Sequence, residues 1–177
     1  GQLLTLPTEN LPLDATIELS ELIQSIVEEN EIEAQAKSVD IHFKSTVDEA
    51  LIAANAEKLC SAIENVLRNA IRYTKNKSSI DISLQRATAK NELSNKPYYD
   101  VCIKDNGPGI PEKDLENIFE PFFRVDDARN NKTGGYGIGL AIAKRVISQH
   151  GGSIRARNTG SGLTVVISLP TLNDQYT

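Results

Sequence analysis

The hydrophobic positions of the chain follow two periods, one typical of helices and one typical of strands. Apolar residues recur three and four apart in segment 16–38, which predicts an amphipathic helix with Ser20 as its N-cap. The apolar stripe of this helix consists of Leu19, Leu22, Ile23, Ile26 and Val27. Segment 56–74 gives the strongest helical pattern, and residues 138–150 predict a helix ended by the glycine pair 151–152.

Alternating and short apolar runs predict the strands. They cover residues 39–45, 51–54, 79–87, 98–105, 153–159 and 162–170. A polar hairpin loop is expected over residues 88–97, and a short helix beginning at Pro111 over residues 111–119. Helices mixed with strands, followed by consecutive strands, predict a two-layer α/β sandwich with helices on one face of a mixed sheet.

Composition limits the class of protein. The 177 residues, 40% hydrophobic and 24% charged, are typical of one soluble globular domain. A net charge of -5 argues against a general nucleic-acid binder, and no apolar run is long enough to cross a membrane. Because the chain begins at Gly1 rather than Met, it is expected to be a fragment or a processed product.

The cysteines and histidines do not predict a metal or disulfide site. Cys60 and Cys102 lie in a helical and a strand pattern, so we interpret them as buried reduced thiols of a cytosolic protein. His42 and His150 lack metal-ligand spacing.

The helix at 56–74 carries a polar flank beside its apolar face. Leu59, Ile63, Val66, Leu67 and Ala70 form that face at about 100° per residue. Asn65, Asn69, Arg72 and Tyr73 follow one side of it. The flank is either simply solvated or functional. In the functional interpretation an amide oxygen binds Mg²⁺, Arg72 binds phosphate and Tyr73 provides an aromatic surface.

Two glycine-containing segments suggest a nucleotide. "DNGPGI" (105–110) is good turn chemistry, but the Asp105 carboxylate could also accept a hydrogen bond from the exocyclic amino group of adenine. "GGYGIGL" (134–140) directly precedes a helix, where backbone N–H groups favour phosphate, although it could merely cap that helix. The long polar segment 124–137 is predicted to be a lid.

Four segments, taken in order, resemble the ATP-binding catalytic domain of bacterial sensor histidine kinases. "NVLRNAIRYT" resembles the asparagine box, "DNGPGI" the first glycine box, "FEPFFRV" the phenylalanine box and "GGYGIGL" the second glycine box. The family shares a superfamily with gyrase, Hsp90-type chaperones and MutL. "DDARNNKTGGYGIGLAI" is most similar to envelope-stress sensors of the Cpx and Rst types. The resemblance implies an α+β fold of the Bergerat type: a mixed, mostly antiparallel sheet of about five strands covered on one face by three helices.

The resemblance also implies roles for individual residues. The residues implied to be catalytic are Asn65, Asn69 and Arg124: Asn69 would be the Mg²⁺ ligand, Asn65 would lie nearer the triphosphate, and Arg124 would bind phosphate. The residues implied to bind ATP are Asn69, Arg72, Tyr73, Asp105, Gly107, Gly109, Ile110, Phe123, Gly135, Gly137, Gly139 and Leu140. Phe119, Phe122 and Phe123 would pack the root of the lid.

The resemblance further implies a division of the chain and a set of partners. Residues 1–13 would be a linker from a dimerisation hairpin, 14–170 the catalytic domain and 171–177 a tail. The implied partners are ATP, a histidine-bearing dimerisation domain of the same kinase and a response regulator, with a cytoplasmic location and no direct membrane contact.

Position 65 separates two hypotheses within the superfamily. Its ATPases and serine kinases resemble one another in placing Glu, a general base, four residues before the metal-binding Asn. Here that position is Asn65, which favours a histidine kinase over an ATPase or a nucleotide-dependent binding module. The neighbouring Glu64 is expected to pair with Arg68 instead.

Overall fold

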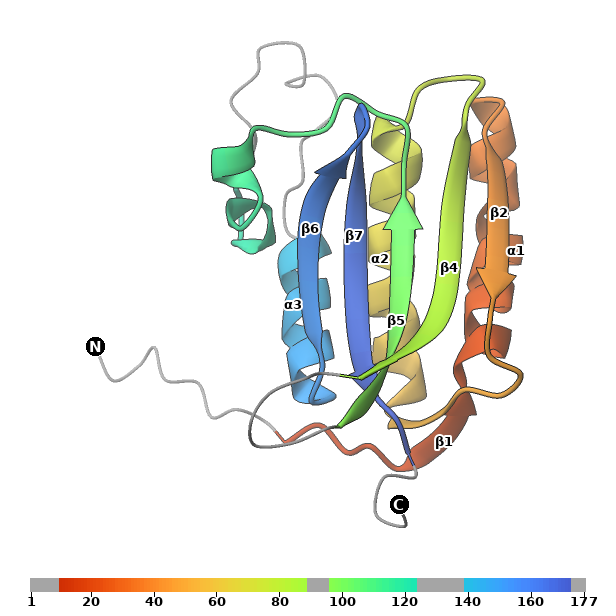
Figure 1. Cartoon of the computed structure of the whole chain (residues 1–177), viewed down its shortest axis with the longest axis vertical. Coiled ribbons are helices and arrows are strands. Elements are labelled where there is room, and N and C mark those ends of the chain that lie inside the picture. The colour runs from red at the N-terminus through yellow and green to blue at the C-terminus, as the bar shows by residue number, and fades with distance from the viewer. Residues whose placement is uncertain (1–9, 89–95, 124–138, 173–177) are drawn as a thin grey trace.

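The computed structural model describes residues 10–88, 96–123 and 139–172, and these form two layers. Helices α1 (Leu19–Ala36), α2 (Ala56–Tyr73) and α3 (Gly139–Gln149) cover one face of a five-stranded sheet (Figure 1). The order across this sheet is β2 (Asp40–Ser45), β4 (Ser79–Thr88), β5 (Pro97–Lys104), β7 (Gly162–Pro170) and β6 (Ser153–Thr159). Only the β2–β4 pair is parallel among these strands, which confirms the predicted mixed, mostly antiparallel sheet.

The first residues of the predicted long helix belong to a strand instead. β1 (Ala15–Glu18) pairs antiparallel with β3 (Leu51–Ala54) in a separate two-stranded sheet. The N-cap of α1 is Glu18, and the prediction of Ser20 was wrong. One Glu18 oxygen accepts from the backbone N–H of Glu21, at 2.8 Å, and the other from that of Ala50, also at 2.8 Å. Glu18 therefore caps the helix and fastens it to the segment before β3, which the shorter Ser20 side chain does not do.

The segment that begins at Pro111 forms two short 3-10 turns rather than one helix. They are η2 (Glu112–Asp114) and η3 (Asn117–Phe119), placed beyond β6 in Figure 1. Pro111 caps the first turn, so the predicted start of this segment is confirmed.

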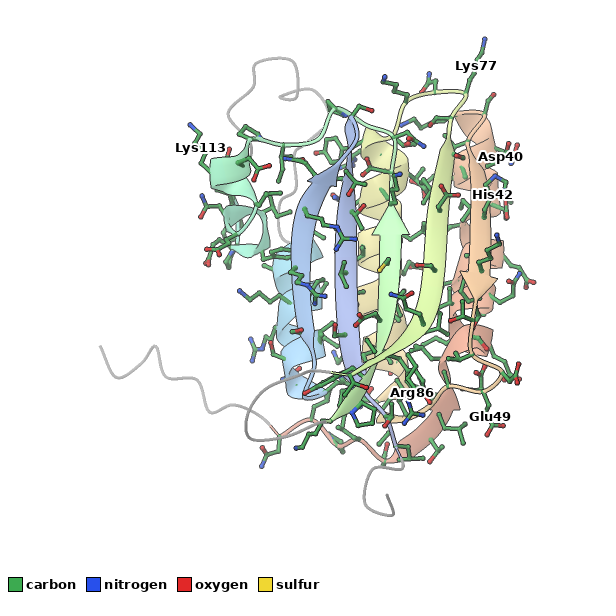
Figure 2. The ribbon with its side chains drawn as sticks, viewed as in Figure 1. Asp40, His42, Glu49, Lys77, Arg86 and Lys113 are labelled. Atoms are coloured by element: carbon green, nitrogen blue, oxygen red, sulfur yellow. The ribbon has the colours of Figure 1, made fainter. Side chains whose placement is uncertain are left out.

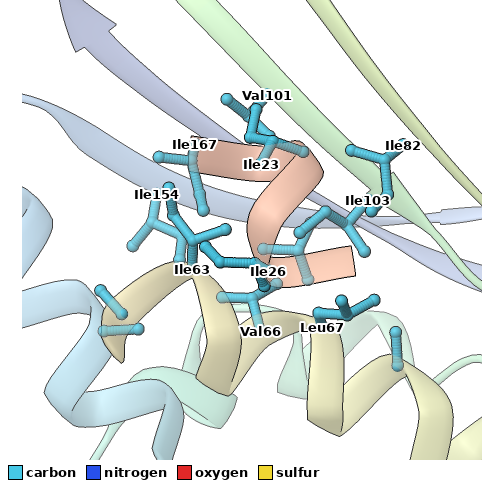
Figure 3. Close-up of a cluster of buried hydrophobic side chains, with 14 of the residues drawn as sticks. Ile23, Ile26, Ile63, Val66, Leu67, Ile82, Val101, Ile103, Ile154 and Ile167 are labelled. Atoms are coloured by element: carbon cyan, nitrogen blue, oxygen red, sulfur yellow. The ribbon is translucent and has the colours of Figure 1, made fainter. Parts of the chain in front are cut away.

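The hydrophobic core lies between the sheet and the helices. Figure 3 shows the side chains of α1 and α2 meeting those of the strands. All five residues predicted for the apolar face of α2 are buried: Leu59, Ile63, Val66, Leu67 and Ala70. Burying each large aliphatic side chain is worth about 1.5–3 kcal/mol. Rotating α2 would expose this face, so the core fixes the direction in which its polar flank points.

The opposite face of the sheet carries polar side chains (Figure 2). β7, between β5 and β6, is buried along both of its faces. Arg155 donates to Ser168, which donates in turn to Asp100. β2 and β6 are the edge strands of this sheet. Within the described part of the chain, no helix is long and apolar enough to span a bilayer.

The Glu18 cap should make stability depend on pH. Burial raises the pKa of Glu18, but hydrogen bonds from Ser20, Ala50 and Glu21 together lower it below its usual value of 4.5. A depressed folded-state pKa stabilises the fold above the unfolded-state value, and this contribution is lost as pH falls through the folded-state value. We expect Glu18→Ala to reduce the free energy of unfolding by about 1–2 kcal/mol at pH 7.

Urea unfolding from pH 7 down to pH 3 measures this effect. The difference between Glu18→Ala and wild type should shrink as the pH falls. Glu29→Ala, which removes an exposed carboxylate from the same helix, is the control and should change stability by less than about 0.5 kcal/mol. An equal effect of both substitutions would contradict the assignment of Glu18 as the cap.

Candidate functional site

Most of the predicted site residues gather toward the end of the sheet where β5 finishes. The end of α2, residues 105–110 and the β6–β7 turn lie at this end, whereas the first turn of α3 lies beside the middle of α2 (Figure 1). Segments that are far apart in the sequence are thus brought together, as the resemblance implied.

Asp105 extends the β5–β7 ladder with its side chain. Its backbone N–H donates to the Leu163 carbonyl at 2.9 Å, and its Oδ1 accepts from the N–H groups of Leu163, at 3.1 Å, and Gly107, at 2.9 Å. The residue is only 5% exposed, and no residue of the described segments donates to its Oδ2. One oxygen is therefore fixed by the backbone, while the other can accept a hydrogen bond from a ligand.

The groups around Asp105 shift the pKa of its carboxyl in opposite directions. Burial raises the pKa of the Asp105 carboxyl. The hydrogen bonds from Gly107 and Leu163 and the positive charge of Lys37 lower it, but less than burial raises it. The carboxyl is therefore protonated at a higher pH than an ordinary aspartate, whose pKa is 3.8.

Glycines allow the chain to pass close to Asp105. A Cβ atom on Gly107 would stand 2.4 Å from the carbonyl oxygen of Tyr73. A Cβ atom on Gly162 would stand 2.0 Å from the carbonyl oxygen of Asp105. The sequence pattern indicated Gly107 but not Gly162, which was expected only as the first residue of a strand. Both positions exclude a side chain for lack of space.

Asn158, on β6, holds the end of the first glycine box. Its Oδ1 accepts from the Ile110 N–H at 3.0 Å, and its Nδ2 donates to the Ile110 carbonyl at 2.7 Å. Gly109 precedes this contact with a φ of 70°, in the left-handed region that favours glycine. Asn158 was not predicted, and only its position just before the β6–β7 turn could have suggested it.

The polar flank of α2 begins beside the first turn of α3. Asn65, Asn69 and Tyr73 are half-buried, whereas Arg72 is exposed. A Cβ atom on Gly139 would lie 4.0 Å from Asn65, so the first residue of α3 is beside the asparagine box. The structure therefore brings the last glycine of "GGYGIGL" together with α2.

Glu64 is directed away from this flank. Its Oε2 accepts from Asn30 Nδ2 on α1 at 3.3 Å. Arg68 pairs with Glu33, also on α1, at 3.6 Å. The predicted Glu64–Arg68 pair was therefore wrong, because both side chains find partners on the helix packed beside α2.

The phenylalanine box is only partly packed. Phe119 is buried, and Phe123 packs against the core. Phe122 is 74% exposed with a φ of 63°, so its predicted packing role was wrong. Ile110 and Leu140 are buried in the core.

Three predicted site residues, Arg124, Gly135 and Gly137, lie outside the described residues, as does the predicted lid at 124–137.

A cavity of about 440 Å³ lies at the other end of the sheet, between Thr88, Tyr98 and Ser153, and contains none of the predicted residues. In the described segments no cluster of His, Cys, Asp and Glu could hold a metal by itself.

The two histidines differ in accessibility. His150 is 3% exposed and bridges two helices, because its Nδ1 bonds to the Val146 carbonyl and its Nε2 accepts from the Asn55 N–H. It is thus a buried link between α3 and the N-cap of α2. His42 is exposed on β2 (Figure 2).

Cys60 and Cys102 are free thiols, as predicted, but they are half-buried rather than buried.

These residues fit a nucleotide. A buried carboxylate with one open oxygen suits an amino-bearing base, and a helix N-terminus beside amide side chains suits a polyphosphate and its cation. The fold and this site together define a nucleotide-binding α+β domain.

Comparisons with known proteins specify the class further. Residues 54–173 match the family described as "Histidine kinase-, DNA gyrase B-, and HSP90-like ATPase". The chain is 37% identical over 125 residues to the sensor histidine kinase WalK of Bacillus subtilis, covering 70% of this chain and 20% of WalK. It is 33% identical over 165 residues to CpxA of Escherichia coli K12, covering 92% of this chain and 34% of CpxA.

Solved structures give the same result. The catalytic domain of the histidine kinase ThkA superposes with a TM-score of 0.73 at 25% identity, covering 89% of this chain and 96% of that one. The chain belongs to the histidine kinase-, DNA gyrase B- and HSP90-like ATPase family, and its named relatives are sensor histidine kinases. It spans 20% of the length of WalK and 34% of that of CpxA.

The Asn158 contact can be tested by substitution. Asn158→Ala should lower the free energy of unfolding by about 1–3 kcal/mol, because the N–H and carbonyl groups of Ile110 lose their partners. Amide exchange at Ile110 should also become faster. Asn117→Ala is the matched control, since its amide makes one exposed hydrogen bond to the Lys113 carbonyl, and it should have little effect. Unchanged exchange at Ile110 in Asn158→Ala would show that the contact is unimportant.

Proposed function

We propose that the chain binds Mg-ATP at this site and donates the γ-phosphoryl group to a histidine on the dimerisation domain of a sensor histidine kinase. That domain then passes the group to an aspartate of a response regulator. The observation that carries the proposal is the buried Asp105 carboxylate beside the end of α2. Its Oδ1 accepts from Gly107 and Leu163, and its Oδ2 has no donor among the residues that the structure describes. The family match and the named relatives support it.

Each part of the nucleotide has residues of suitable chemistry. Asp105 would accept a hydrogen bond from the amino group of adenine. The amide oxygen of Asn69 would hold Mg²⁺, which neutralises phosphate charge when it is bound. The α3 N-terminus at Gly139 and the guanidinium of Arg72 would attract the phosphates.

Three further assignments belong to this proposal and rest on the resemblance alone. Arg124 would assist transfer, Gly135 and Gly137 would wrap the phosphates, and residues 124–137 would act as a lid over the triphosphate. Amide exchange over 124–137, with and without an ATP analogue, would measure the lid directly.

Transfer to a partner is better supported than hydrolysis. An amide cannot accept a proton at neutral pH, so Asn65 cannot activate water as a general base. Glu64 could, but its carboxylate is held on the other side by Asn30. A neutral imidazole is already nucleophilic, so a histidine acceptor does not need a base at position 65.

Exposed apolar side chains offer a surface for the histidine-bearing domain. Phe122 is 74% exposed and Ile142, on α3, is 44% exposed. A positive φ is unfavourable for phenylalanine, and strain of this kind is found at functional sites. We therefore assign these two side chains to contact with the partner domain.

Two further parts of the proposal concern the response regulator and the location. A structure of ThkA is described as a complex with the response regulator protein TrrA. We place a response regulator among the partners of this kinase by analogy, and the domain in the cytoplasm, where ATP is available.

Base recognition is tested with Asp105→Ala. Losing a hydrogen bond to a charged, buried group should weaken binding of a fluorescent ATP analogue by roughly 10- to 100-fold. Binding of the guanine analogue should change much less, because guanine has a carbonyl oxygen where adenine has its amino group. Asp81→Ala, which removes an exposed carboxylate from β4, is the control. Equal losses for both bases, or none for ATP, would contradict the role of Asp105.

Phosphoryl transfer is tested with γ-labelled ATP and a histidine-bearing hairpin fragment of the same kinase. Acid-labile label should appear on the hairpin only when this chain is present, and Asn69→Ala should reduce it strongly. Asn76→Ala removes an exposed amide just beyond α2 and should leave the label unchanged. Acid-labile label on this chain alone would refute transfer to a separate domain, and rapid phosphate release without the hairpin would favour an ATPase.

A further inference from the structure

Lys37 makes an unusual set of hydrogen bonds at the end of α1. Its half-buried side chain reaches α2, where Nζ donates to the carbonyl oxygens of Ile71 at 2.6 Å, Arg72 at 2.9 Å and Thr74 at 3.0 Å. All three ammonium protons are therefore used on one short stretch of backbone. The last carbonyls of a helix lack partners within the helix, and a cation there also interacts favourably with the helix dipole.

The backbone held by Lys37 is also in contact with the first glycine box. The Tyr73 carbonyl lies where a side chain on Gly107 would be. Next to it, Thr74 Oγ1 accepts from the Asn106 N–H at 2.9 Å, and the Lys75 N–H donates to the Asn106 carbonyl at 3.3 Å. Displacing the end of α2 would therefore displace the residues on either side of Asn106.

Lys37 also interacts with Asp105 through its charge. Its ammonium lowers the pKa of Asp105 against the larger, opposite effect of burial. Burial lowers the pKa of Lys37 itself, while Asp105 and Glu33 raise it. The charged groups that face Lys37 are thus Asp105, after β5, and Glu33, on α1, and Glu33 also pairs with Arg68 on α2.

We propose that Lys37 is a positioning residue of the nucleotide site: its ammonium holds the last turn of α2 against the first glycine box and supplies the positive charge that faces Asp105. This inference rests on the proposed function. Lys37 touches no part of the nucleotide in this scheme. It acts through Arg72 and Tyr73, which the last turn of α2 carries, and through the charge of Asp105.

Three substitutions separate charge from packing. Lys37→Met keeps the length of the side chain but removes its charge and donors, Lys37→Arg keeps the charge, and Lys77→Met is the control. Lys77 lies close by, because its N–H donates to the Lys37 carbonyl, but its side chain extends into solvent (Figure 2). If Lys37→Met does not fold, Lys37→Gln, an uncharged donor, replaces it.

Two measurements use the whole chain. The first is the affinity for a fluorescent ATP analogue at neutral pH, where Lys37→Met should bind about tenfold more weakly, Lys37→Arg should recover much of this loss, and Lys77→Met should match wild type. The second is an NMR titration of the Asp105 carboxyl without nucleotide. Its midpoint should move to higher pH in Lys37→Met, because the ionised form loses a favourable charge, and should stay near the wild-type midpoint in Lys37→Arg.

The titration distinguishes this inference from a general loss of packing. An effect of packing alone on the Asp105 midpoint would not depend on whether the residue at position 37 is charged. Unchanged affinity in Lys37→Met, or an unchanged Asp105 midpoint, would overturn the inference while leaving the proposed function intact. A wild-type chain that binds no ATP analogue would refute the proposed function, and this inference with it.

Discussion

The burial of one face of α2 is the constraint on which the rest of the site depends. Leu59, Ile63, Val66 and Leu67 fill the space between the sheet and the neighbouring helices, and rotating the helix would expose them to water. The asparagines need no contact of their own to be directed correctly, because the apolar residues between them set the orientation. The core thus determines which way the polar flank of α2 points. Asparagine is a poorer helix former than alanine or leucine, and burial of the apolar face keeps α2 helical despite this cost.

Around α2, backbone groups rather than side chains shape most of the described site. Gly107 and Gly162 let two segments approach Asp105 so closely that a methyl group would not fit at either position. The Asp105 carboxylate is then held by N–H groups that cannot change rotamer. A site built in this way is already organised before a ligand arrives, which reduces the ordering cost of binding.

The sequence was sufficient where a local pattern determines the structure, and insufficient where a contact joins distant residues. The apolar face of α2 and the position of Asp105 at the end of β5 follow from periodicity and residue type. The partner of Glu64 does not, since Asn30 lies on another helix. Local rules favoured Ser20 as the cap of α1, but they could not show that Glu18 also reaches the backbone of Ala50. The contact of Asn158 with Ile110 and the exposure of Phe122 are likewise tertiary features.

The two edges of the large sheet have a consequence for how the molecule behaves in a crowded solution. An uncovered edge strand presents unpaired backbone groups, to which the strand of another molecule could add. β2 carries Asp40, His42 and Lys44 as exposed residues, and β6 carries Arg155 and Arg157. Charged side chains along an edge make the addition of another strand costly, because they would lose water. The two arginines of β6 would also meet like charges in a second copy of that strand. The charges on both edges therefore disfavour edge-to-edge pairing of these molecules.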